Sequence, residues 1–350
     1  YIQVTNNVVK QIKAKDVRRF VREWSEERCL NENVRNLIVN SMKFSETSLE
    51  NLKEVELDFS NFTHNTQLFF FPNNNVEVTP KEIIVHQRGD TAFNHYVWEE
   101  NVLKHNFKPL PDMFKLTCLD KENNLYDIDV LDCKSSPIFG YVINTSRLHW
   151  RKEMEERFED NPEEAKAYAE KHRFCINGEG LTEDEIREQK QNLANKIFAI
   201  GYMLHRFKSP SRAWAPQAMD NKIGENGECN GRSGKSFLFK TLSLFMKSVK
   251  LSGRNPKLMD NPHVFDQVNV HTDFVLVDDC AQYRSMGLFY DIITSDMTIN
   301  PKNNQSYSIP FEQSPKFAFT TNYVPADFDA STEARLLYMV FSDYYHQQTE

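Results

Sequence analysis

The chain has 350 residues and a formal net charge of −8 at pH 7, and 40% of its residues are hydrophobic. This length predicts two domains, each large enough to bury a core. No apolar run reaches the ~20 residues of a membrane span, and the start shows no signal-peptide pattern. The acidic balance excludes a general coating protein for polyanions, but it allows a local basic surface. The six cysteines form no CxxC pair, which argues against zinc and fits a reducing compartment.

Residues 1–150 predict an α+β N-terminal domain of unclear role. Apolar residues recur at helical spacing over 14–42, and strand-like segments follow. Residues 151–210 are densely charged, and Thr182 followed by Glu185 forms a capping box that starts a helix. We interpret this second region as a solvated helical collar that packs through the apolar stripe beginning at Leu193. A surface for subunit contact is the alternative.

From residue 211 onward the pattern changes to alternating strands and helices, which predicts a parallel α/β domain over 211–345. The strands are apolar throughout, as strands buried on both faces should be. The expected strands are Trp214–Met219, Phe274–Val277, Phe317–Thr320 and Leu336–Phe341.

A run of small and polar residues opens an apolar helical pattern in this domain. Small residues before a helix let backbone N–H groups close around a phosphate. Lys235 is expected to reach the β- and γ-phosphates of a nucleotide, and the Ser236 hydroxyl to bind Mg²⁺. Cys229 stands where the usual pattern has glycine. The predicted phosphate-binding residues are Asn230, Gly231, Arg232, Ser233, Gly234, Lys235 and Ser236.

Two adjacent carboxylates, Asp278 and Asp279, follow the apolar strand Phe274–Val277. Ligand sites of α/β sheets lie at the carboxyl ends of strands. Asp278 is expected to hold the Mg²⁺ shell through water, and Asp279 to orient or deprotonate an attacking water. An ordinary acidic pair at a strand end is the alternative. The position of the pair behind a buried strand and downstream of Lys235 favours the functional interpretation.

Two further polar residues are candidates for contact with a γ-phosphate. Asn322 ends another buried strand and is expected to bond the γ-phosphate or the attacking water; an ordinary turn residue is the alternative. Arg335 is expected to stabilise charge on the nucleotide of a neighbouring subunit. A surface salt bridge with Glu333 or Asp329 is the alternative for that arginine.

The segment Met297–Ile309 predicts a β-hairpin, because two alternating stretches flank a Pro-Lys-Asn-Asn tip. In a ring of subunits, Lys302 and Asn303 at such tips would line a central channel. There the lysines would pair with the backbone phosphates of a single nucleic-acid strand. A solvated hairpin tip is the alternative, and the position between the acidic pair and Asn322 favours the first interpretation.

In this order, the motifs resemble superfamily-3 helicases, specifically the poxvirus-type and the phage or plasmid primase–helicases. The likeness covers residues 191–345, and its most specific part is Thr-Thr-Asn-x-x-Pro followed by Asp329 and Arg335. The resemblance implies an α/β P-loop ATPase domain of the AAA+-like type with a central parallel sheet. The segments that carry it are Asn230–Ser236, Val275–Asp279, Thr298–Lys302, Thr320–Pro325 and Phe341–Tyr345.

The resemblance implies an ATP hydrolase and DNA helicase with ATP and Mg²⁺ as cofactors. The subunits would form a homo-oligomeric ring, expected to be a hexamer, that translocates on single-stranded DNA. By position Asn322 takes the sensor role, and Arg335 the role of a finger from the neighbouring subunit. Family members often carry two arginines there, whereas Ala334 precedes Arg335 here. Lys222 lies where some relatives use a lysine in trans.

The resemblance also implies a primase domain or a polymerase as a partner, and no membrane. We expect the protein to act in the bacterial cytoplasm, either as a bacterial protein or as a phage protein in its host. Residues 1–150 show no primase metal-site pattern, so any such domain would precede Tyr1, and we expect the chain to be a fragment or processed product. Two alternatives stay open: a packaging or remodelling P-loop ATPase, and a replication-initiator nucleotide switch with little turnover. The Lys302 hairpin argues against the first, and Asp279 with Asn322 against the second.

Overall fold

The computed structural model describes residues 1–50, 52–154, 156–158, 160–221, 232–255, 257–281, 287–323 and 330–345. The chain divides into two compact units, Tyr1–Lys108 and Pro109–Glu350. The predicted division into segments near residues 150 and 210 stays a prediction. Within the described residues, no helix is both long enough and apolar enough to cross a membrane.

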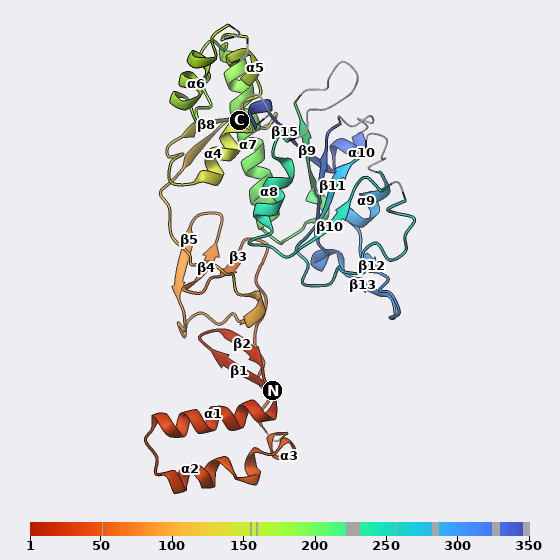
Figure 1. Cartoon of the computed structure of the whole chain (residues 1–350). Helices are drawn as coiled ribbons and strands as arrows, with labels where there is room; N and C mark the ends of the chain where they lie inside the picture. The colour runs from red at the N-terminus through yellow and green to blue at the C-terminus, as the bar shows by residue number, and fades with distance from the viewer. Residues whose placement is uncertain are drawn as a thin grey trace. The chain divides into compact units, whose positions relative to one another are not determined.

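The first unit contains helices and short sheets (Figure 1). Two helices, α1 and α2, lie within the segment 14–42 where helical spacing predicts them. Asn31 caps α2 by accepting a hydrogen bond from the backbone N–H of Asn33. β1, β2 and β6 form one sheet, and β3, β4 and β5 another. The elements are β1 (Ile2–Thr5), β2 (Val8–Gln11), α1 (Ala14–Glu27), α2 (Glu32–Val39), α3 (Glu46–Leu49), β3 (Gln67–Phe70), β4 (Asn74–Val78), β5 (Ile83–Gln87) and β6 (Val97–Trp98).

The second unit begins with an antiparallel hairpin and a group of helices. The longest helix, α7, starts at the predicted capping box, in which the Thr182 hydroxyl accepts from the Glu185 N–H. α7 packs against β8, β15 and α8 (Figure 1). The elements are β7 (Phe114–Asp120), β8 (Leu125–Val130), α4 (Pro137–Asn144), α5 (Trp150–Glu153), α6 (Pro162–Lys171) and α7 (Glu183–Leu204).

The buried face of α7 is more polar than its apolar stripe predicts. Leu193 is fully buried as expected, but so is Lys196. Its ammonium donates to the Thr145 carbonyl at 2.5 Å and to the Ser146 hydroxyl at 3.2 Å. A buried cation is tolerated only when such acceptors surround it. The helix therefore packs through hydrogen bonds as well as through apolar contact.

A five-stranded sheet in the order β10–β11–β14–β9–β15 forms the centre of this unit, and all of its strand pairs are parallel. Its middle strands are apolar because both faces are covered; Val275, Val277 and Phe319 are fully buried. The predicted parallel sheet is confirmed. Its strands and flanking helices are β9 (Ala215–Asp220), α8 (Lys235–Leu242), β10 (Ser248–Ser252), β11 (Phe274–Cys280), α9 (Gly287–Thr294), β14 (Lys316–Thr321), α10 (Ala330–Glu333) and β15 (Leu336–Phe341).

The sheet order places β14 between β9 and β11. Because the strands are parallel, their carboxyl ends lie at one edge of the sheet. The segments after β9, β11 and β14, which carry the predicted functional motifs, therefore converge there.

The predicted hairpin is present as β12 (Met297–Ile299) and β13 (Tyr307–Ile309). The two strands pair antiparallel, with Thr298 opposite Ser308. Met297 and Ile309 are buried, so the hairpin is anchored at its base. Its tip contains Lys302, which is exposed.

Candidate active site

The predicted phosphate-binding loop enters helix α8 through Gly234, where the backbone and the space both require glycine. Gly234 is the N-cap of α8 and has a left-handed backbone with φ +99°. A Cβ at this position would lie 2.7 Å from the Tyr141 hydroxyl, which donates a hydrogen bond to the Gly234 carbonyl. Arg232 is also left-handed, with φ +76°. Asn230 and Gly231, together with Cys229 and Lys222, lie outside the described residues.

Lys235, the first residue of α8, is held by a buried carboxylate. Its ammonium lies 2.5 Å from Asp220 Oδ1, and the side chains are only 7% and 1% exposed. It also donates to Ser233 Oγ at 3.1 Å, and Ser233 in turn donates to Asp220. Burial raises the pKa of Asp220, although Lys235 opposes the rise. Asp220 ends β9, and no sequence motif predicted this partner.

Asp278, on β11, is contacted by side chains from α8, β14 and β10. Its Oδ1 accepts from the Ser236 hydroxyl at 2.8 Å and from the Thr320 hydroxyl at 2.6 Å. Lys250, at the sheet edge on β10, contacts Oδ2 at 2.7 Å. Burial opposes ionisation of Asp278, but the hydrogen bonds from Lys250, Thr320 and Ser236 outweigh it and lower the pKa. The carboxylate is therefore ionised at neutral pH.

Asp279 adopts an uncommon backbone conformation for a side-chain-bearing residue, with φ +61°. The register between β11 and β14 shifts at this point. The Asp279 N–H donates to Thr320 Oγ1 at 2.7 Å, which secures the irregular backbone. The carboxylate lies 2.5 Å from Nε of Arg254. One threonine hydroxyl thus positions both members of the acidic pair.

These groups surround a cleft of about 370 Å³ at the carboxyl edge of the sheet. Three groups that are distant in sequence meet here: the described part of the predicted phosphate-binding loop, the acidic pair and Asn322. Thr320 and Arg254 also line the cleft, and sequence reasoning assigned them no role. The lining residues are Arg232, Ser233, Gly234, Lys235, Ser236, Phe237, Arg254, Asp278, Asp279, Thr320 and Asn322.

Arg335 lies at the other end of the sheet from this cleft. Arg335 directly precedes β15, and the first residue of β15 pairs with Ala215 at the start of β9. The predicted phosphate-binding loop follows the opposite end of β9. Ala215 and Asp220, the two ends of β9, are five positions apart, which corresponds to about 17 Å along a strand. The guanidinium lies over the Tyr290 ring, 5.2 Å from its centroid. Lys302 and Asn303 likewise do not line the cleft of their own chain.

The oxygen donors in the cleft fit a magnesium ion. Ser236 Oγ and Asp278 Oδ1 already lie 2.8 Å apart and face the same space. Among the described residues there is no cluster of three or more carboxylates, histidines or cysteines that could hold a metal by itself. Mg²⁺ in nucleotide sites is usually held by one or two protein oxygens together with phosphates and water. The donor set suits an ion that arrives with a nucleotide.

Comparisons with known proteins give distant structural matches. No family profile and no curated protein matches the sequence. The apo structure of the NrS-1 C-terminal region covers 80% of this chain, with 13% identity and a TM-score of 0.34. A structure of the JCV helicase with a bound phenoxyphenyl acetamide covers 59%, with 11% identity and a TM-score of 0.29. This chain spans 60% and 46% of those two chains. At these TM-scores the likeness carries no argument about function.

Proposed function

We propose that the chain is an ATP-hydrolysing motor that acts as a DNA helicase. The observation that carries the hydrolase part is the meeting of Lys235, Ser236 and the acidic pair in one cleft, with Asn322 from the neighbouring strand. The cleft combines a helix N-terminus and a lysine for phosphates with carboxylates for an ion and a water. Such a set suits phosphoryl transfer to water.

Each residue has one task in this proposal. Lys235 and the loop N–H groups hold the β- and γ-phosphates, and Ser236 and Asp278 hold Mg²⁺. The ion, when bound, neutralises charge that develops on the phosphate oxygens. Asp279 orients the attacking water and accepts its proton. Asn322 donates a hydrogen bond to the γ-phosphate or to that water.

The helicase part rests on two residues outside the cleft. Arg335 lies at the opposite end of the sheet, so it serves the nucleotide of a neighbouring subunit, as a ring would require. Lys302 stands at an exposed hairpin tip, where ammonium groups from successive subunits would follow a single DNA strand. A hexameric ring is the assembly proposed. A packaging ATPase, or an initiator with little turnover, remains the alternative proposal.

Turnover by purified protein tests the hydrolase. We expect Mg-dependent phosphate release from ATP, lost by at least about a hundredfold in Lys235→Ala and in Asp279→Asn. Lys166→Ala is the control, because Lys166 is an exposed helical lysine of the same unit, on α6, and lines no part of the cleft. Wild-type turnover that survives both cleft substitutions would refute the proposal. Wild-type protein that binds ATP but hardly hydrolyses it would favour the switch.

Strand separation tests the helicase. Lys302→Ala should abolish unwinding of a forked DNA while leaving basal ATP hydrolysis within about twofold, because Lys302 does not line the cleft of its own chain. Lys257→Ala, another lysine of the same unit away from the hairpin tip, serves as the control. A Lys302→Ala variant that unwinds at the wild-type rate would remove the channel role.

A further inference from the structure

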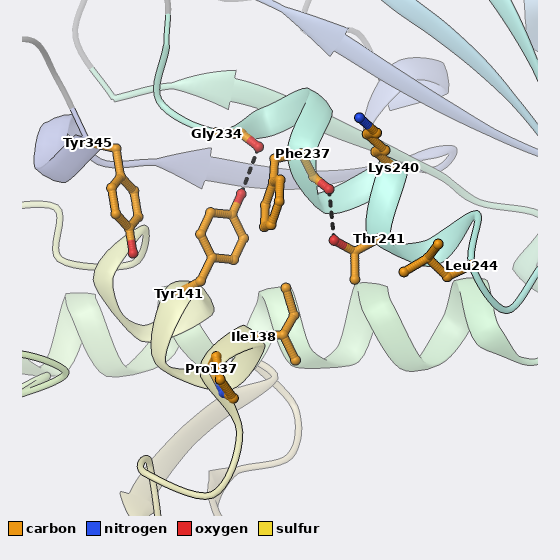
Figure 2. A pocket seen from close by; sticks show the side chains of 9 residues that line it. All are labelled: Pro137, Ile138, Tyr141, Gly234, Phe237, Lys240, Thr241, Leu244 and Tyr345. Carbon is orange, nitrogen blue, oxygen red and sulfur yellow. Dashed lines mark hydrogen bonds between the residues drawn. The ribbon is translucent and has the colours of Figure 1, made fainter. Parts of the chain in front are cut away.

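A second cavity, of about 690 Å³, adjoins the phosphate-binding loop. α4 contributes one wall, α8 another, and Tyr345 lies beside Tyr141 (Figure 2). Gly234 and Phe237 line both this cavity and the cleft that holds the acidic pair. The two spaces therefore share the start of α8 as a common wall. The lining residues are Pro137, Ile138, Tyr141, Gly234, Phe237, Lys240, Thr241, Leu244 and Tyr345.

The cavity is mainly apolar and aromatic. The Tyr141 ring packs edge-on against Phe237, with centroids 5.0 Å apart, and stacks on Tyr345 at 5.6 Å. Phe237 and Leu244 are 53% and 57% exposed, although both are large apolar side chains. Exposed apolar side chains that gather around a hollow are typical of ligand sites. Folding of the described residues leaves this surface uncovered.

The polar groups in the cavity are largely occupied by partners in the chain. The Tyr141 hydroxyl donates to the Gly234 carbonyl at 2.7 Å, and the Thr241 hydroxyl donates to the Phe237 carbonyl at 3.0 Å (Figure 2). The Tyr345 hydroxyl accepts from Asn144 at 3.2 Å. What these residues offer to a ligand is thus mostly flat apolar surface. Such surface binds a planar ring by stacking.

We propose that this cavity binds the base and sugar of the nucleotide whose phosphates lie on the loop, with a purine as the planar ring. The inference rests on the proposed function. Its independent support is the shared wall: a ligand that spans both spaces must be anionic at one end and flat and apolar at the other. A nucleoside triphosphate has that form. Tyr141 then acts as a positioning residue, because it forms the base wall and also fixes the carbonyl of Gly234.

Binding measurements with two ligands separate this inference from the proposed function. Calorimetry compares Mg-ATP with Mg-tripolyphosphate, which has the phosphates but no base. Stacking on aromatic side chains predicts that ATP binds about tenfold or more tightly than tripolyphosphate. Leu244→Asp places a charge in the cavity far from the loop, so ATP affinity should fall about tenfold and tripolyphosphate affinity should stay within about twofold.

Phe245→Asp is the matched control, since Phe245 is the adjacent residue, is 40% exposed, and lines neither cavity. It should leave the affinity for both ligands within about twofold. Equal affinity of wild-type protein for both ligands would overturn the base site and leave the phosphate site standing. Affinities that do not change in Lys235→Ala would instead overturn the proposed function. An equal loss of ATP binding in both aspartate variants would also overturn the base site.

Photolabelling of the wild-type chain supplies a test that needs no substitution. After illumination with 8-azido-ATP and Mg²⁺, the label should lie on peptides from α4, α8 or the segment around Tyr345. Excess ATP should prevent labelling, whereas excess adenine-free tripolyphosphate should prevent it less effectively. Label confined to other peptides would overturn the assignment. Label that excess ATP does not displace would overturn it as well.

Discussion

Thr320 is the residue whose hydroxyl links the two carboxylates of the cleft. It donates to Asp278 Oδ1 at 2.6 Å and accepts from the Asp279 N–H at 2.7 Å. Thr320→Val keeps the side-chain shape and removes only this hydroxyl. We expect the substitution to disturb both carboxylates at once. It is a test of positioning, because Thr320 itself carries no charge.

The size of the effect follows from the two bonds. Thr320 is 1% exposed, so water does not replace the hydroxyl. A hydrogen bond to a charged group contributes ~1.5–3 kcal/mol, and an unsatisfied buried donor costs ~1–3 kcal/mol. Relaxation of the surrounding side chains offsets part of these two costs. We therefore expect Thr320→Val to lower the free energy of unfolding by ~2–4 kcal/mol. Loss of such a supporting bond typically lowers activity ~10–100-fold, here in kcat rather than in KM.

Urea unfolding and steady-state ATP hydrolysis measure the two effects separately. Thr272→Val is the matched control: Thr272 is also buried, but its hydroxyl accepts from the Asn269 N–H at 3.1 Å and it lines no part of the cleft. This control should lose stability and keep kcat within about twofold. Thr320→Ser, which retains the hydroxyl, should recover most of the activity. The reasoning is refuted if Thr320→Val hydrolyses ATP at the wild-type rate, or if both valine variants lose kcat equally.

Two further predictions concern the fold around the cleft. A Cβ on Gly253 would lie 2.7 Å from backbone atoms of Cys280, so Gly253→Ala should lower the free energy of unfolding by ~1–3 kcal/mol; an unchanged thermal melt would contradict this. The hydrogen bond from Lys152, with those of the helix cap, lowers the pKa of Glu185 from 4.5 to about 2. Its contribution to stability is therefore present above about pH 4.5 and is lost as the pH falls toward 2. Glu185→Gln should flatten the fall in melting temperature over this range, whereas the exposed Glu183→Gln should not; identical profiles would refute it.

Local sequence patterns point to several residues that line the cleft. Small residues before an apolar helix identify the loop that ends at Lys235, and buried strands ending in acids or amides identify Asp278 and Asn322. The strands predicted for the parallel sheet are all present, with ends displaced by a few residues. β10 escapes prediction because it is an edge strand whose side chains alternate between half-buried and exposed. Each of these patterns depends on residues that are close together in the chain.

The remaining parts depend on sheet order, which no local pattern reveals. Thr320 reaches both acids only because β14 inserts between β9 and β11. Asp220 becomes the partner of Lys235 because β9 ends beside the start of α8. Tyr141 and Tyr345 are about 200 residues apart in the sequence of the second unit, and only the packing of the folded chain stacks their rings. The sequence shows that such residues are present, but it does not show which of them become neighbours.

The ion pairs of the cleft differ in how readily a nucleotide can exchange them. The side chains of Lys250 and Arg254 are 64% and 74% exposed, and pairs of this kind contribute only ~0–1 kcal/mol. Both cations can therefore leave their carboxylates for phosphate oxygens at little cost. The pair of Lys235 with Asp220 is buried, and removing one partner from such a pair costs ~3–5 kcal/mol.

Lys235 need not leave Asp220 to bind a phosphate. An ammonium group has three N–H donors, and Asp220 and Ser233 accept two of them. Among the described residues, Asp220 and Ser233 are the acceptors found for this ammonium, so its third N–H is available to a phosphate oxygen. We therefore expect the Lys235–Asp220 contact to persist when nucleotide binds, while Arg254 turns away from Asp279 and frees that carboxylate for water. A structure of the nucleotide complex in which Lys235 has left Asp220, or Arg254 still covers Asp279, would contradict this order of exchange.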